Sequence, residues 1–139
     1  MARILVVDDE EHIRRFYSEE LADEGHKVWT TATGHELLKT IDNLQPEVVV
    51  LDIRLVDYDG LDLLLEVRNK HHDLPVILCT AYDTYKHNQK SIAADYYVVK
   101  SFDLSELKIA IQKAIEASGS AQPTILESLS QEGRRRIPE

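Results

Sequence analysis

The segment VVVLDIRLVDYDG, residues 48–60, contains the pattern that decides the fold. Its first four residues form an uninterrupted apolar run rather than an alternating one, and Asp52 follows at once. Such short continuous runs are typical of strands that are buried on both faces, as in a parallel sheet covered by helices. Helical spacing begins directly afterwards, at Leu61, Leu64, Leu65 and Arg68. The segment therefore predicts a buried strand, an acidic turn and a helix.

The same alternation runs along most of the chain. Strands are predicted over residues 4–7, 28–31, 48–51, 76–78 and 96–99, and helical spacing covers residues 13–21, 37–41, 61–68 and 104–115. Gly25, Pro46 and Pro75 stand where predicted elements end or begin. Alternating strands and helices favour an α/β fold, a doubly wound parallel sheet of five strands with helices on both faces. We expect residues 1–118 to form this single domain.

Two segments fit the pattern less well. The helix expected over residues 83–94 has few apolar positions, so we expect it to open easily and to be the mobile element of the domain. Residues 119–139 have no clear period, and their basic and acidic side chains cancel. We interpret this last segment as a mobile tail or the remnant of a linker.

Composition excludes several classes of protein. The 139 residues include 16 Lys and Arg against 25 Asp and Glu, a net charge of −9 that argues against electrostatic binding to nucleic acid or to an anionic membrane. The single cysteine, Cys79, excludes a disulfide framework and is expected to be a buried core thiol. No apolar run is long enough to cross a membrane or to act as a signal peptide. We therefore expect a cytoplasmic protein that binds neither nucleic acid nor membrane directly.

Chemically active residues follow the predicted strands at their carboxyl ends, where open parallel sheets bind ligands. They are Asp8 and Asp9 after the first strand, Asp52 after the third, Thr80 and Ala81 after the fourth, and Lys100 after the fifth. Taken alone, Asp8 and Asp9 also fit a helix N-cap and its first turn. Taken together, three carboxylates would repel one another unless a cation compensated them, and Mg²⁺ prefers such oxygen ligands. A carboxylate held against Mg²⁺ and a lysine can act as a nucleophile on phosphorus.

Four ordered motifs carry a family resemblance: VVDDE at 6–10, LDIRLVDYDG at 51–60, CTA at 79–81 and YYVVKSF at 96–102. Over about residues 2–118 the chain resembles the chemotaxis-type receiver domain of two-component response regulators. The resemblance implies a flavodoxin-like fold with strand order 2-1-3-4-5. It also implies that Asp52 is the phosphoacceptor and that Mg²⁺ is bound by Asp8, Asp9, Asp52 and the backbone carbonyl of Arg54. The residues that contact the phosphoryl group or switch with it would be Lys100, Thr80, Ala81 and Tyr97.

The resemblance further implies partners. The phosphoryl donor would be a phosphohistidine on a sensor histidine kinase or on a phosphotransfer protein, and the domain would be a regulatory phosphoacceptor rather than an enzyme with other substrates. The face formed by residues 83–94, the fifth strand and the last helix, with Ile109 pointing outward, would bind a partner or a second copy. A receiver-like binding module that takes no phosphate is the alternative, and an Mg²⁺-dependent phosphohydrolase is a distant third.

The residue after Lys100 departs from the family pattern. Receivers usually have a proline there, preceded by a cis peptide bond, whereas this chain has Ser101. A cis bond before a non-proline residue costs about 2.5–4 kcal/mol. Because burial of Phe102 and a helix cap at Asp103 would fix the far end of this loop, we expect the bond to keep the cis form.

Overall fold

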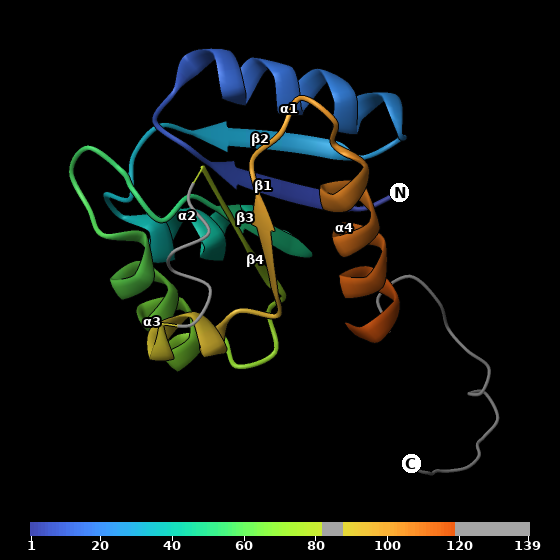
Figure 1. The fold of residues 1–139 in the computed structure, drawn as a ribbon. Coiled ribbons are helices and arrows are strands. Elements are labelled where there is room, and N and C mark those ends of the chain that lie inside the picture. Colours follow the sequence, from blue (N-terminus) through green and yellow to red (C-terminus); the bar gives the residue numbers. More distant parts are fainter. Residues whose placement is uncertain (82–87, 119–139) are drawn as a thin grey trace, which may run out of the picture.

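The computed structural model describes residues 1–81 and 88–118, which form one sheet with helices on both faces (Figure 1). In chain order the elements are β1 (Arg3–Val7), α1 (Glu11–Asp23), β2 (Lys27–Thr31), α2 (Leu37–Leu44), β3 (Val48–Leu51), α3 (Gly60–Lys70), β4 (Val76–Thr80), the 3₁₀ helix η1 (Gln89–Ala93), β5 (Tyr96–Val99) and α4 (Ser105–Ser118). The strands are parallel and lie in the order β2-β1-β3-β4-β5. This confirms the predicted fold class and strand order.

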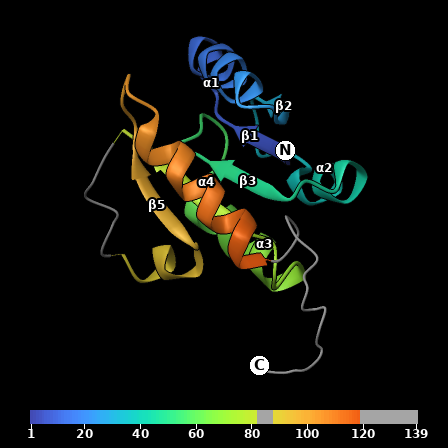
Figure 2. The same cartoon turned by 90° about the vertical axis from the view of Figure 1, so that its right-hand side faces the viewer.

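Alternation along the strands divides the core into two apolar clusters. Ile4 and Val6 of β1 face a cluster that includes Tyr17 of α1 and Leu107 of α4, so α1 and α4 cover one face of the sheet. Leu5 of β1 faces the other cluster, to which α2 and α3 contribute. Figure 2 shows α4 lying across the strands on its side of the sheet. All four apolar residues of the predicted stripe on the last helix are buried: Leu104, Leu107, Ile111 and Ile115.

The helix ends follow local rules. Gly25 has φ of 91°, the left-handed conformation that glycine adopts without strain, and it follows α1 as predicted. Asp59 caps α3, since its carboxylate accepts a hydrogen bond from the Leu61 N–H at 2.8 Å. The Asp103 carboxylate accepts from the Ser105 N–H at 2.9 Å at the start of α4, in agreement with the predicted cap. Within residues 1–81 and 88–118, no helix has both the length and the apolar character needed to span a bilayer.

The structure corrects three expectations. The described backbone contains no cis peptide bond, so Lys100–Ser101 is trans, as expected where no proline lowers the cost of the cis form. Phe102 is 96% exposed rather than buried. Leu65, which belongs to the apolar spacing predicted for α3, lies at the surface. The buried side of this helix contains Leu63 and Leu64 instead.

The predicted helix over residues 83–94 is described only in part. Residues 88–94 hold a short 3₁₀ helix, η1, rather than α-helix, and residues 82–87 lie outside the described part of the chain. Lys90 of η1 forms an ion pair with Asp62 of α3 at 2.8 Å, and Arg68 of α3 donates to the Ala93 carbonyl at 3.0 Å. The expected mobility of residues 83–94 stays a prediction, as does the tail over residues 119–139, which also lies outside the described residues.

Gly60, the first residue of α3, lies against the backbone of the two residues that follow β3. A Cβ there would stand 2.1 Å from the Asp52 carbonyl oxygen and 2.6 Å from the Ile53 Cα, both backbone atoms that cannot rotate away. We therefore expect Gly60→Ala to lower the free energy of unfolding in urea by about 2–3 kcal/mol. Gly25→Ala is the matched control: its Cβ meets open space among the described residues, and only its positive φ costs about 1 kcal/mol. Equal losses in the two variants would contradict the steric argument.

Candidate functional site

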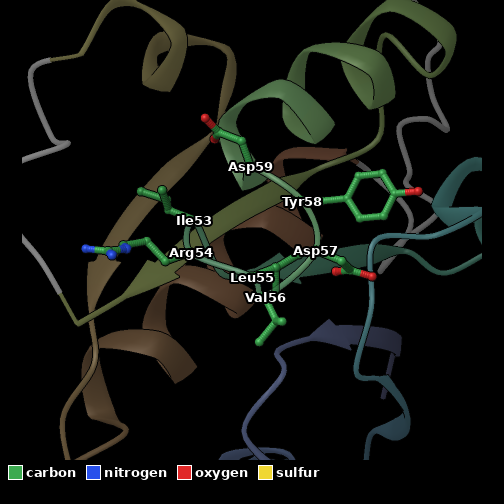
Figure 3. A pocket seen from close by; sticks show the side chains of 7 residues that line it. All are labelled: Ile53, Arg54, Leu55, Val56, Asp57, Tyr58 and Asp59. Carbon is green, nitrogen blue, oxygen red and sulfur yellow. The ribbon is translucent and has the colours of Figure 1, made fainter.

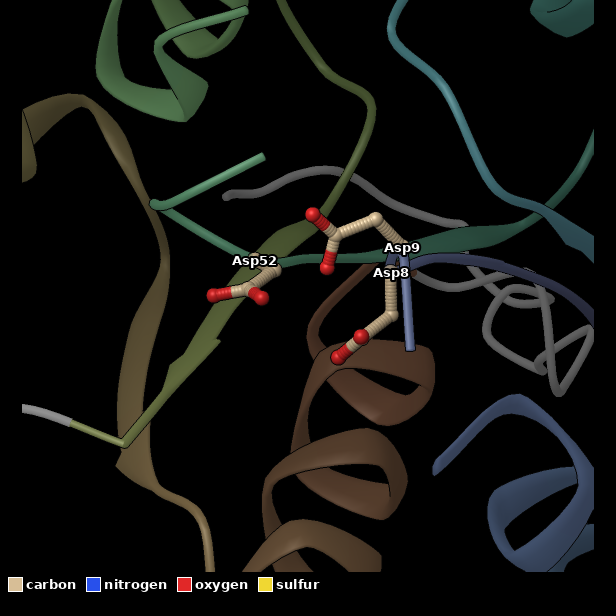
Figure 4. Close-up of side chains that lie close together, drawn as sticks. All are labelled: Asp8, Asp9 and Asp52. Atoms are coloured by element: carbon tan, nitrogen blue, oxygen red, sulfur yellow. The ribbon is translucent and has the colours of Figure 1, made fainter. Parts of the chain in front are cut away.

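Acidic side chains from two strands meet at the carboxyl edge of the sheet. Asp8, Asp9 and Asp52 each place a carboxylate oxygen within 4.8 Å of the others. Figure 4 shows these three side chains gathered at this edge. The Asp8 and Asp52 residues are buried and Asp9 is half-buried. The sequence-predicted convergence of these three carboxylates is therefore present in the structure.

The backbone places these residues by extending the parallel ladder one step beyond the strands. The Asp8 N–H donates to the Thr31 carbonyl of β2 at 3.1 Å, and the Asp52 N–H donates to the Val7 carbonyl of β1 at 3.0 Å. The Lys100 N–H donates to the Thr80 carbonyl of β4 at 2.7 Å. Because main-chain bonds fix all three residues, their side chains enter the same space with little freedom.

Lys100 places its ammonium between two of the buried acids. Its Nζ lies 2.7 Å from Asp8 Oδ2 and 3.1 Å from Asp52 Oδ2, and the three side chains are 11%, 3% and 7% exposed respectively. Burial alone would lower the pKa of Lys100, but the hydrogen bond that it donates to Asp8 and the attraction of both carboxylates outweigh burial and raise the pKa. Lys100 is therefore charged at neutral pH.

Asp52 experiences opposing influences. Burial raises its pKa, the Lys100 ammonium lowers it, and the nearby Asp8 charge raises it again; the balance lies above the ordinary value for aspartate. The Arg54 N–H also donates to Asp52 Oδ1 at 3.3 Å. Burial destabilises the charged form of this carboxylate, and a bound cation would stabilise it. The three carboxylates together therefore suit a divalent metal ion that prefers oxygen ligands.

The polar groups next to the cluster are neutral. The Tyr17 hydroxyl and the Cys79 thiol lie 3.5 Å apart in the core. Burial raises the pKa of both, that of Cys79 to about 11, so neither is charged near pH 7. Cys79 is thus the buried thiol that the sequence predicted.

Thr80 is fully buried, and among the described residues its hydroxyl has no hydrogen-bond partner. Such a group is rare in a native structure. Ala81, the next residue, is exposed at the end of β4, and Tyr97 is half-buried and packs with the α3 side of the core. The structure thus brings Thr80 and Ala81 to the edge that holds the acids, while Tyr97 lies within the sheet.

The loop after Asp52 surrounds a surface hollow of about 550 Å³ lined by residues 53–59. In Figure 3 the Arg54 and Tyr58 side chains point to opposite sides of this loop. The lining includes none of the three clustered carboxylates. The hollow therefore borders the carboxylate cluster without being part of it, and the Arg54 carbonyl as a metal ligand stays a prediction.

At the start of α1 the helix-cap alternative for Asp8 and Asp9 does not hold, and Glu10 makes a contact that the sequence did not reveal. Asp8 and Asp9 do not cap the helix, since Glu10 is its N-cap residue and makes no side-chain cap. The Glu10 carboxylate instead lies 3.4 Å from the Lys100 ammonium, a contact that sequence reasoning missed. The only signal was the acidic run of residues 8–10, which does not reveal which of its members reaches a residue 90 positions away.

Comparison with known proteins places these features in a family. The sequence model of one family, the response regulator receiver domain, matches residues 4–112, which include all three acids and Lys100. The chain belongs to this family. This receiver domain is 37% identical over 116 residues to the regulatory protein AtoC of Escherichia coli, covering 82% of the chain and 25% of that relative. The chain spans between one quarter and about half of the lengths of the curated relatives it matches.

Solved structures agree with the same assignment. The response regulator protein TrrA of Thermotoga maritima, in complex with Mg²⁺ and a beryllium fluoride, is 45% identical with a TM-score of 0.79 over 82% of this chain and 99% of that one. TrrA in complex with the histidine kinase ThkA matches at 44% identity and a TM-score of 0.78, over 83% of this chain and 99% of TrrA. The chain is therefore a receiver domain of two-component response regulators, a regulatory module.

Lys100 should contribute more to stability than a surface lysine does. In Lys100→Met without divalent cations, buried Asp8 and Asp52 lose their countercharge, so the free energy of unfolding should fall by about 3 kcal/mol. Adding Mg²⁺ should then raise the melting temperature of the variant more than that of the wild type, because the metal restores positive charge to the site.

The control is Lys108→Met. Lys108 pairs with Glu20 at 3.3 Å and Glu24 at 3.6 Å on the surface, where solvent screens such pairs and they contribute little to stability. A Lys100 variant no less stable than the Lys108 variant would argue against the central role of this ammonium.

Proposed function

We propose that this domain is a phosphorylation switch in which Asp52 accepts a phosphoryl group in a Mg²⁺-dependent reaction. The observation that supports this best is the position of Asp52, which is buried beside two other carboxylates and 3.1 Å from the Lys100 ammonium. Mg²⁺ held by Asp8, Asp9, Asp52 and the Arg54 carbonyl would supply positive charge to the phosphoryl oxygens.

The proposed transfer needs only groups of this chain and of the donor. A carboxylate oxygen of Asp52 attacks the phosphorus of a phosphohistidine, the new O–P bond forms as the P–N bond breaks, and the imidazole keeps the electron pair and takes up a proton. Lys100 stays charged and donates to a phosphoryl oxygen. The domain would thus catalyse its own phosphorylation. In a separate step, water would attack the phosphorus of the acyl phosphate, and breaking of the O–P bond would release inorganic phosphate and restore the Asp52 carboxylate.

Thr80 is the proposed sensor of the modified state. Its buried hydroxyl, for which residues 1–81 and 88–118 supply no partner, would donate to a phosphoryl oxygen on Asp52. Because a ligand shifts a conformational equilibrium only through bonds that differ between the states, this one new bond gives the switch its driving force. Ala81, which follows β4, and Tyr97 of β5 are the other two residues of the proposed switch.

The proposed phosphoryl donor is a phosphohistidine on a sensor histidine kinase or a phosphotransfer protein, with the reaction in the cytoplasm. The complex of TrrA with the kinase ThkA supports a kinase partner for a domain of this similarity. The output target lies beyond what this domain determines, since the relatives are longer than the chain.

Asp52→Asn should abolish covalent labelling by acetyl phosphate. The amide is nearly the same size as the carboxylate but is a far weaker nucleophile, so intact-mass spectrometry in Mg²⁺ should show the added phosphoryl mass on wild type and not on the variant. Chelation of Mg²⁺ should abolish labelling of the wild type as well.

Asp9→Ala serves as the control, since it removes a metal ligand but leaves Asp52 in place. It should still label, at a higher Mg²⁺ concentration. If Asp52→Asn labels as the wild type does, the phosphoacceptor is assigned wrongly, and a wild type that never labels would favour the binding module that takes no phosphate.

We also propose that η1, β5 and α4 form the surface for a partner or a second copy. Each of these elements exposes an apolar residue, namely Ile92, Val99 and Ile109, and β5 and α4 lie next to each other in Figure 2. Ile109 is 55% exposed, as its place outside the buried stripe of the last helix predicted.

Ile109→Glu should weaken association driven by fluoroberyllate and Mg²⁺ by about tenfold, because it places a charge in an apolar contact. Sedimentation equilibrium of wild type and variant, with and without the mimic, measures this. Leu65→Glu on α3 is the control, since Leu65 is an apolar residue that is 40% exposed and lies outside the proposed surface. Unchanged association of the Ile109 variant would remove this face from consideration.

A further inference from the structure

The Lys100 ammonium has a third acidic neighbour at the surface. Besides Asp8 at 2.7 Å and Asp52 at 3.1 Å, it lies 3.4 Å from Glu10 Oε1. A lysine ammonium has three N–H donors, and here each has a carboxylate to bind. Lys100 can therefore donate to a phosphoryl oxygen on Asp52 only when one of these three contacts is given up.

The contact with Glu10 is the one that is easiest to give up. Its distance is the longest of the three, and the Glu10 side chain is 51% exposed, whereas those of Asp8 and Asp52 are almost completely buried. An exposed carboxylate returns to water at little cost, while a buried one would be left without a countercharge. The incoming phosphoryl oxygen would therefore replace Glu10 rather than Asp8.

The backbone keeps Glu10 in place for this role. Its N–H donates to Asp8 Oδ1 at 2.9 Å, so the same carboxylate that binds Lys100 through one oxygen fixes Glu10 through the other. Glu10 is also the N-cap residue of α1, and the next turn of the helix restrains it further. Its side chain starts from a fixed point within reach of the ammonium.

We propose that Glu10 is a positioning residue that holds Lys100 in the unphosphorylated domain and competes with the phosphoryl group for it. This rests on the proposed phosphorylation of Asp52. The Glu10 carboxylate occupies a donor of Lys100 and also repels the negative phosphoryl oxygens, so both effects weaken the bound phosphoryl state. Glu10 thus sets how strongly the site binds a phosphoryl group, without touching the reacting atoms.

Glu10→Gln tests this against Glu11→Gln as the matched control. Both variants remove one negative charge from neighbouring positions of the acidic segment, but Glu11 pairs with Arg15 at 3.5 Å rather than with Lys100. Titration with fluoroberyllate at saturating Mg²⁺, followed by NMR of the backbone amides, should give Glu10→Gln a two- to fivefold lower apparent dissociation constant, roughly the size of an exposed ion-pair effect. Glu11→Gln should bind as the wild type does.

Salt provides the readout that a merely structural role would not change. Because Glu10 is exposed, the difference between wild type and Glu10→Gln should shrink in about 0.5 M salt, where the Debye length is only a few ångströms. Equal gains in the Glu10 and Glu11 variants would reduce the effect to net charge and overturn the proposal. Unchanged affinity in Glu10→Gln would overturn it too.

The same titration separates this proposal from the one on which it rests. If the wild type binds no fluoroberyllate and takes no label from acetyl phosphate, the phosphorylation of Asp52 fails and the role of Glu10 fails with it. If the wild type binds and labels at Asp52 while the two glutamine variants behave alike, the phosphoacceptor assignment stands and only the role of Glu10 is rejected.

Discussion

The ammonium of Lys100 between the buried carboxylates of Asp8 and Asp52 is the interaction on which the carboxyl edge of this sheet depends. Two carboxylates at this depth would otherwise repel each other, and one would take up a proton. The Lys100 ammonium offsets this repulsion and lowers the pKa of Asp52 against the effect of its burial. The arrangement stabilises the fold only in part, because buried ion pairs gain little over the cost of their desolvation. We infer that the main role of this charge arrangement is chemical rather than stabilising.

The scaffold supports this charge balance with neutral neighbours. The Tyr17–Cys79 pair satisfies its own polar atoms and adds no charge beneath the acids. Thr80 differs, since its hydroxyl is completely buried and has no partner among the described residues. This hydroxyl is the group to which the proposed switch assigns the new bond of the phosphorylated state.

Sequence alone predicted the parts of this molecule that depend on periodicity and order. Continuous apolar strands, helical stripes and strand-end residues fixed the sheet and placed Asp8, Asp52 and Lys100 at one edge, because these follow from local pattern and parallel topology. Contacts that depend on side-chain reach were not predictable, as the approach of Glu10 to Lys100 shows. Phe102 was wrongly expected in the core, because hydrophobicity does not reveal whether a loop turns a side chain inward. The bond before Ser101 is trans, as the cost of a cis bond before a non-proline residue predicts, although receivers usually have a cis bond at this position.

The backbone hydrogen bonds that extend the ladder to Asp8, Asp52 and Lys100 have a consequence for how such a domain can diversify. Main-chain amides hold the reactive edge in register whatever side chains the outer helix surfaces carry. Residues exposed on α1, η1 or α4 can therefore be exchanged at little risk to the carboxylates, provided that the buried stripes remain apolar. The proposed partner surface, with Ile92, Val99 and Ile109, uses other positions than the carboxylate cluster. An engineer could therefore change this surface and leave the three acids in place.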